Sequence, residues 1–105
     1  MRVRLARQAA DYIRQEAQYL RARSPAAAMR FLEQVRSVRR DLEQHSQAGF
    51  ASDDLPIPGL RRLIRDGYRF DYRLTERFIE VAAISSSVNT PLTGPSDAPD
   101  FDYEL

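Results

Sequence analysis

The sequence of 105 residues contains no cysteine and no lysine. Without cysteine, disulfide bonds and thiolate chemistry are excluded, and the chain fits a reducing compartment. A zinc site of the usual kind lacks ligands, because His45 is the sole histidine. The chain also has no glycine-rich phosphate loop and no nucleophile elbow. We therefore expect no metal and no cofactor.

Long apolar runs are missing as well. No stretch approaches the roughly 20 apolar residues that a membrane span requires. The N-terminus reads Met1-Arg2-Val3-Arg4-Leu5 and then turns polar, which does not resemble a signal peptide. The sequence therefore predicts a cytoplasmic protein. Its length suits one domain.

The charge is unevenly distributed along the chain. All sixteen basic residues are arginine. All of them lie within residues 1–90, which contain eleven acidic residues. Residues 91–105 carry no arginine and four acids, which are Asp97, Asp100, Asp102 and Glu104. A GC-rich genome would explain the missing lysine, but it would not explain this segregation. A basic body with an acidic tail indicates an acidic or polyanionic partner, or internal masking. We therefore divide the chain into a domain, residues 1–90, and an acidic tail, residues 91–105, that is flexible or docks.

Two amphipathic segments predict a helical hairpin. The first runs from about Arg7 to Arg23, with apolar residues spaced along one stripe. The second runs from Pro25 to about Gln44. Ser24 suits the N-cap of the second helix, and proline suits the first helical position because its missing N–H would have no partner there. The short joint makes the two helices antiparallel neighbours.

The second half of the domain predicts strands. Residues 2–5 form a short first strand, residues 50–59 a loop without a regular element, and residues 60–65, 68–75 and 78–84 a meander. Asp66-Gly67 predicts a two-residue hairpin turn, since both residues tolerate positive φ. The pattern ends at Ser85. The resulting fold class is α+β, an antiparallel helical hairpin packed on a small antiparallel sheet in the order β-α-α-β-β-β.

These residues resemble the RelE/ParE superfamily of type II toxin–antitoxin toxins. The resemblance covers about residues 3–84 and consists of weak matches in a fixed order. Its most telling part is residues 67–74, Gly-Tyr-Arg-Phe-Asp-Tyr-Arg-Leu, followed by Ile79-Glu80-Val81. Earlier matching segments are Leu5 to Leu20, Ser24 to Phe31, Leu42 to Gly49 and Gly59 to Leu63. The resemblance implies the same fold that the periodicities predict.

The resemblance implies two different functions. ParE-like members poison DNA gyrase, and RelE-like members cut messenger RNA in the ribosomal A site. Both types are neutralised by an antitoxin, which here would be ParD-like and would form a hetero-oligomer with the toxin. A further alternative is a relative that binds only its antitoxin.

We favour the gyrase inhibitor, which is a binding module rather than an enzyme in its own right. RNA cleavage without a metal needs a base, an acid and cations. The chain lacks lysine, His45 lies near the end of a helix, and Ser85-Ser86-Ser87 stands where many relatives carry a histidine or a similar polar group. The long, regular hairpin also matches ParE-like members. Ribosome-dependent endoribonuclease activity of RelE type remains the alternative.

Arginines of the predicted meander are the candidate binding residues for the target or the antitoxin. Members that face the same way on adjacent strands should cluster, and arginine binds carboxylate and phosphate through two parallel hydrogen bonds. The candidates are Arg61, Arg62, Arg65, Arg69 and Arg73. The alternative is a solvated face with cross-strand pairs to Asp66, Asp71 and Glu80. We assign no catalytic residue, because Tyr68, Phe70 and Tyr72 alternate with arginine and so belong to the core under the helices.

The acidic tail ends in three apolar residues that alternate with acids, namely Phe101, Tyr103 and Leu105. Such a segment can dock as an added strand or as a short anchor on a partner. Its charge complements the arginines of the domain. The alternative is a disordered solubilising tail.

Overall fold

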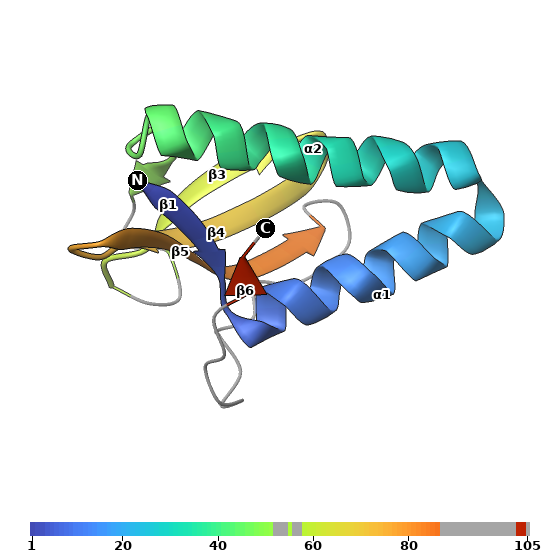
Figure 1. Ribbon diagram of the computed structural model, residues 1–105, viewed down its shortest axis with the longest axis horizontal. Coiled ribbons are helices and arrows are strands. Elements are labelled where there is room, and N and C mark those ends of the chain that lie inside the picture. Colours follow the sequence, from blue (N-terminus) through green and yellow to red (C-terminus); the bar gives the residue numbers. More distant parts are fainter. Residues whose placement is uncertain (52–54, 56–57, 87–102, 105) are drawn as a thin grey trace.

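Two helices lie on one side of a six-stranded sheet (Figure 1). The structure is a computed structural model, and it describes residues 1–51, 55, 58–86 and 103–104. The described elements follow the order β1, α1, α2, β2, β3, β4, β5 and β6. This arrangement confirms the predicted α+β fold with a helical hairpin on a sheet. Within the described residues, neither helix has the length and apolar character that crossing a membrane requires.

The helical hairpin consists of α1 (Arg7–Arg23) and α2 (Pro25–Gln44), with the bounds that the sequence predicts. Ser24 ends the first helix and begins the second. Its backbone N–H donates to the Leu20 carbonyl at 2.7 Å, and its Oγ accepts from the Ala27 N–H at 3.2 Å. One residue therefore satisfies orphan groups of both helices, which allows so short a connection.

The sheet strands are β1 (Arg2–Leu5), β2 (Phe50–Ala51), β3 (Arg61–Arg65), β4 (Tyr68–Leu74), β5 (Phe78–Ser86) and β6 (Tyr103–Glu104). Their order across the sheet is β2-β3-β4-β5-β1-β6. The sheet is mixed rather than antiparallel throughout, because β1 pairs with β5 in parallel. The helical hairpin connects β1 to the meander. It returns the chain to the end of the sheet at which β1 began, so that β5 can run parallel to β1. A parallel neighbour requires a connection of this length.

Two boundaries differ from the sequence-based expectation. The predicted loop after α2 contains the two-residue strand β2, because Phe50 and Ala51 pair with Arg62 and Arg61 before the prolines are reached. The last strand of the meander continues through Ser85 and Ser86, which pair with Arg69 and Tyr68. Weak strand propensity at these serines is overridden by the backbone pairing that β4 offers.

The turn between β3 and β4 matches its prediction. Asp66 has φ of 53° and Gly67 has φ of 83°. Two successive residues with positive φ give the strands the right-handed twist of a tight hairpin. The turn fixes the register in which Arg62 lies directly opposite Asp71.

A bulge in β5 explains why that strand is apolar on both faces. Asp71 pairs with Ala83 and Tyr72 pairs with Val81, so Ala82 is left without a partner. The extra residue rephases the alternation of side chains. Ile79 and Val81 before the bulge and Ile84 after it therefore all reach the core beneath the helices.

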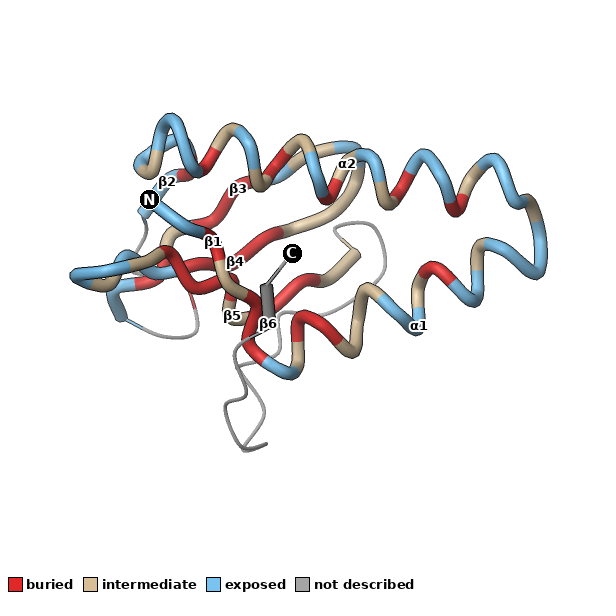
Figure 2. The backbone as a smooth tube through the Cα atoms, viewed as in Figure 1, coloured by how far each residue is buried: buried red, intermediate tan, exposed pale blue. Residues whose placement is uncertain are grey.

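The core lies between the sheet and the two inward helix faces (Figure 2). Beyond the edge of the sheet the hairpin continues, so that the turn between α1 and α2 projects past every strand (Figure 1). Tyr68, the first residue of β4, packs against both helices. Its ring lies 4.8 Å from the Phe31 ring of α2 and 6.4 Å from the Tyr12 ring of α1.

Candidate functional site

Two of the five predicted arginines belong to the helix side of the sheet. Arg65 donates from Nη1 to Ser37 Oγ at 3.0 Å and lies 2.5 Å from Asp41 Oδ2, so it joins β3 to α2. Arg61 donates from Nη2 to the carbonyls of Gln47 and Gly49, at 3.1 and 2.5 Å. Both guanidinium groups hold neighbouring segments of this chain in place.

Arg62 and Asp71 form a buried ion pair on the opposite face of the sheet. Arg62 Nε and Nη2 donate to the two carboxylate oxygens of Asp71 at 2.6 and 2.8 Å. Arg62 is 5% exposed and Asp71 is 4% exposed. Removing either partner would leave a charge in a low-dielectric environment, which is strongly unfavourable. The pair therefore has a structural role, and its guanidinium is not available to a partner.

Arg69 and Arg73 lie on this same face, further along β4. Arg69 Nη2 donates to the Ser86 carbonyl at 2.5 Å. Arg73 Nη2 lies 2.7 Å from Glu80 Oε1. The carboxylate of Glu80 is buried, whereas the Arg73 side chain is 51% exposed. Of the five candidates, Arg73 presents its side chain to solvent most directly.

The five arginines thus do not form one surface. Arg61 and Arg65 lie on one side of the sheet and Arg62, Arg69 and Arg73 on the other, because successive side chains of a strand point to opposite faces. Neighbours in sequence such as Arg61 and Arg62 are necessarily separated. The expected cross-strand pairing is observed for Asp71 and Glu80.

A cluster of two tyrosines and a carboxylate joins α1 to the sheet. Tyr68 donates from its hydroxyl to Glu16 Oε2 at 2.5 Å. Burial and the adjacent Glu16 raise the pKa of Tyr68 far above its usual value. The same two causes raise the pKa of Tyr12 to about 12. A phenol that holds its proton this firmly is a poor general base at neutral pH.

Tyr72 is fully buried and locks the loop after α2. Its hydroxyl accepts the Gly49 N–H at 2.9 Å. A Cβ placed on Gly49 would meet the Arg62 carbonyl oxygen at 2.6 Å and the Tyr72 ring at 2.8 Å. Glycine is therefore required here by a close approach of two backbone segments. Tyr72 belongs to the core, as the alternation of β4 predicts.

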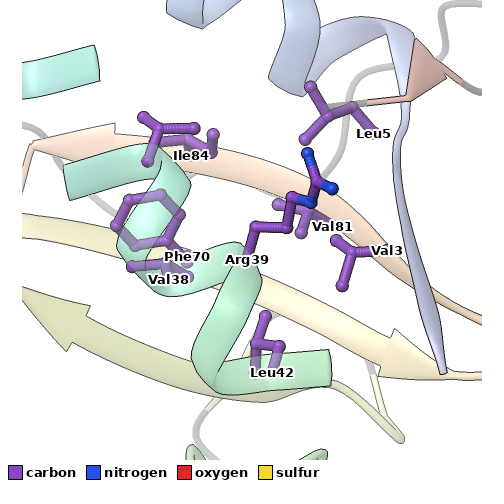
Figure 3. A pocket seen from close by; sticks show the side chains of 9 residues that line it. Val3, Leu5, Val38, Arg39, Leu42, Phe70, Val81 and Ile84 are labelled. Carbon is purple, nitrogen blue, oxygen red and sulfur yellow. The ribbon is translucent and has the colours of Figure 1, made fainter. Parts of the chain in front are cut away.

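A recess lies between α2 and the sheet (Figure 3). It is lined by apolar side chains of α2, β1, β4 and β5, and it is too narrow to admit a water molecule. The one charged residue on its wall is Arg39, which donates to Glu43 at 3.2 Å. The recess is therefore a gap in core packing and does not have the polar groups of a substrate pocket.

The tail residues are described only in part. Tyr103 and Glu104 form β6, which pairs antiparallel with Leu5 and Arg4 of β1. Phe101 and Leu105 lie outside the described residues.

No group of side chains in the described part of the chain could hold a metal ion. His45 caps the C-terminus of α2, and its backbone N–H donates to the Asp41 carbonyl at 2.7 Å.

The sequence offered Asp71 and Glu80 only as partners on a solvated face, although both are buried, and it did not single out Glu16. Asp71 and Glu80 each hold an arginine, and Glu16 holds Tyr68. The signal available for Asp71 is its place in the strongly alternating residues 68–74 opposite Arg62. For Glu16 the partner is distant in sequence, and no local pattern indicates it.

Comparison with known proteins places this fold in context. A family model described as the ParE toxin of the type II toxin–antitoxin system parDE matches residues 3–89. No curated protein matches the chain. A solved structure entitled "Chromosomal ParDE TA system from P. aeruginosa" aligns with 82% of this chain and 95% of its own, with a TM-score of 0.67 and 19% identity. At that identity the likeness shows a shared fold.

Proposed function

This chain belongs to the ParE toxin family of type II toxin–antitoxin systems, and from that premise we propose that it inhibits DNA gyrase and is neutralised by a cognate ParD-like antitoxin. The proposal describes a protein that acts by binding, in the cytoplasm, without a metal or cofactor. The observation that carries it is the family match across residues 3–89, which spans both helices and the meander.

The chemistry of the sheet supports binding rather than RNA cleavage. Most of the predicted arginines are occupied by contacts within the chain, and Arg62 is buried with Asp71. Arginine stays protonated and does not serve as a base. Tyr12 and Tyr68 are held protonated by burial and by Glu16. The sheet arginines and these two tyrosines thus supply cations for a phosphate but no base for a 2′-hydroxyl, which disfavours the RelE-type alternative.

An antitoxin partner is supported by the related structure from P. aeruginosa, whose title names a ParDE system. We infer that the antitoxin forms a hetero-oligomer with this chain. Of the five predicted arginines, Arg73 is the best placed to contact a partner. Its guanidinium is paired with the buried Glu80, while about half of its side chain remains exposed. Arg69 lies on the same face and is the second choice. The other three, Arg61, Arg62 and Arg65, contribute to binding indirectly, because their contacts stabilise the fold that presents Arg73 and Arg69.

Expression of the chain in a bacterial host, with and without its proposed antitoxin, tests this function. We expect growth arrest with induction of the SOS response, and rescue when the antitoxin is co-expressed. Mapping the 5′ ends of cellular transcripts in the same cells provides the comparison. Cleavage of translated messages without an SOS response would favour the ribonuclease instead.

A further inference from the structure

The end of the helical hairpin that projects past the sheet differs from the rest of the helices in its charge. Between Glu16 and Glu33 the chain has three arginines and no acidic residue. We define this hairpin tip as residues 17–32, with Arg21, Arg23 and Arg30 as its cations. The tip lies at the far end of the molecule from the β4–β5 turn (Figure 1).

Arginines of the helix bodies are paired with carboxylates on their own helix. The partners are Asp11 for Arg7 and Arg14, Glu33 for Arg36 and Arg40, and Glu43 for Arg39. The three tip arginines have no such ion pair among the described residues. The helices therefore neutralise their charge along the body and leave it uncompensated at the tip.

Helix stability does not account for the tip charges. Arg21 and Arg23 lie in the last turn of α1, where cations interact favourably with the helix dipole. Arg30 lies in the N-terminal part of α2, where that benefit is absent. The first turn of α2 also lacks the acidic residue that the dipole would favour. The helix dipole therefore explains the positions of Arg21 and Arg23 but does not explain the position of Arg30.

Two large apolar side chains are exposed at the same end. Tyr19 is 52% exposed and Met29 is 71% exposed. The Arg23 guanidinium lies 3.8 Å from the centre of the Tyr19 ring, a cation–π contact that favours this arrangement of the two side chains. Tyrosine, methionine and arginine are enriched at protein interfaces, whereas phosphate contacts need no exposed methionine.

We propose that the hairpin tip is the surface that contacts the toxin's protein target, by entering an acidic recess with an apolar floor. This inference rests on the proposed function, because it assigns the contact to the inhibited enzyme. A projecting pair of helices reaches into a larger partner, while the broad body remains free for the antitoxin. The carboxylates of the recess pair with the tip arginines, and Met29 and Tyr19 bury against its floor.

The test uses the full chain carrying Arg21→Glu, Arg23→Glu and Arg30→Glu together. We expect the concentration for half-inhibition of gyrase supercoiling to rise at least about tenfold, since like charges at an interface are strongly unfavourable. Antitoxin affinity should stay within about twofold of wild type, which shows that the variant is folded. A matched pair of single variants controls for charge reversal as such. Arg23→Glu reverses one charge at the tip, and Arg77→Glu reverses one charge at the exposed β4–β5 turn. Only Arg23→Glu should weaken inhibition.

Milder variants separate the two parts of the contact. Arg30→Gln should weaken inhibition less as ionic strength rises from about 50 to about 300 mM, because salt screens the lost attraction. Met29→Ser should weaken it at both salt concentrations, because it removes apolar contact. Both substitutions are at exposed positions and leave the core intact.

Three results would overturn the inference. In the first, the triple variant inhibits gyrase and arrests growth as strongly as wild type. In the second, the triple variant loses as much affinity for the antitoxin as it loses inhibition of gyrase. In the third, wild type binds duplex DNA alone, and the triple variant loses that binding as it loses inhibition. A wild-type chain that arrests growth but does not inhibit gyrase would instead refute the proposed function. In that case the growth assay still tests the inference: loss of growth arrest in the triple variant would support the tip as the target contact, and unchanged growth arrest would contradict it.

Discussion

Replacing Asp71 with leucine tests whether Arg62 is structural. The variant leaves a guanidinium that is 5% exposed without its carboxylate and removes hydrogen bonds of 2.6 and 2.8 Å. Breaking a buried pair from one side costs about 3–5 kcal/mol. A domain of this size has a free energy of unfolding of about 5–15 kcal/mol. With a urea m-value of about 1.3 kcal/mol/M, the midpoint should fall by about 3 M.

Equilibrium urea unfolding followed by circular dichroism measures this loss. The double replacement Arg62→Met with Asp71→Leu removes both charges and keeps the volume, so we expect it to recover most of the stability. Arg36→Met, at an exposed ion pair with Glu33, is the matched single replacement and should cost less than about 1 kcal/mol. A loss below about 1 kcal/mol for Asp71→Leu would refute a structural role for the pair.

Three other perturbations follow from the geometry. Gly49→Ala places a Cβ 2.6 Å from the Arg62 carbonyl oxygen, so thermal unfolding should show a loss above about 2 kcal/mol, and an unchanged melting temperature would contradict the close approach. Ser24→Ala removes the N-cap of α2 and should cost about 1 kcal/mol in urea, whereas Ser24→Asp should restore it. Because the folded-state pKa values of Tyr12 and Tyr68 are raised, the stability that these two tyrosines contribute should be constant below pH 10 and fall as pH rises toward 12. The double phenylalanine variant should lose less over that window, and an equal loss would contradict the assignment.

The alkaline experiment benefits from the composition of the chain. The chain has no lysine and no cysteine, so neither of these side chains ionises in that window. The difference between wild type and the double phenylalanine variant therefore reports on Tyr12 and Tyr68 without interference from those two residue types.

The fold was predictable because its local signals agree. Ser24-Pro25 and the two apolar stripes set the helices to their observed bounds, and Asp66-Gly67 set the hairpin turn. The parallel pairing of β1 with β5 and the bulge at Ala82 were not predictable. Both depend on contacts between distant segments, which no local period encodes.

The candidate site was predictable only in part. The alternation of β4 correctly placed Phe70 and Tyr72 in the core. It could not show that Arg62 would be buried with Asp71, because burial on the outer face depends on what covers it. Nor could the sequence reveal that the arginine-bearing end of the hairpin lies beyond the sheet, since the relative lengths of the two layers appear only in the assembled fold (Figure 1).

Inhibition of purified gyrase is the most direct test of the central claim. Purified chain is incubated with gyrase, ATP and plasmid DNA, and the DNA is examined after rapid denaturation of the enzyme. We predict linear plasmid that accumulates with added chain and disappears when the antitoxin is added first. Unimpaired supercoiling with no linear product, at concentrations that arrest translation in a cell-free system, would contradict it.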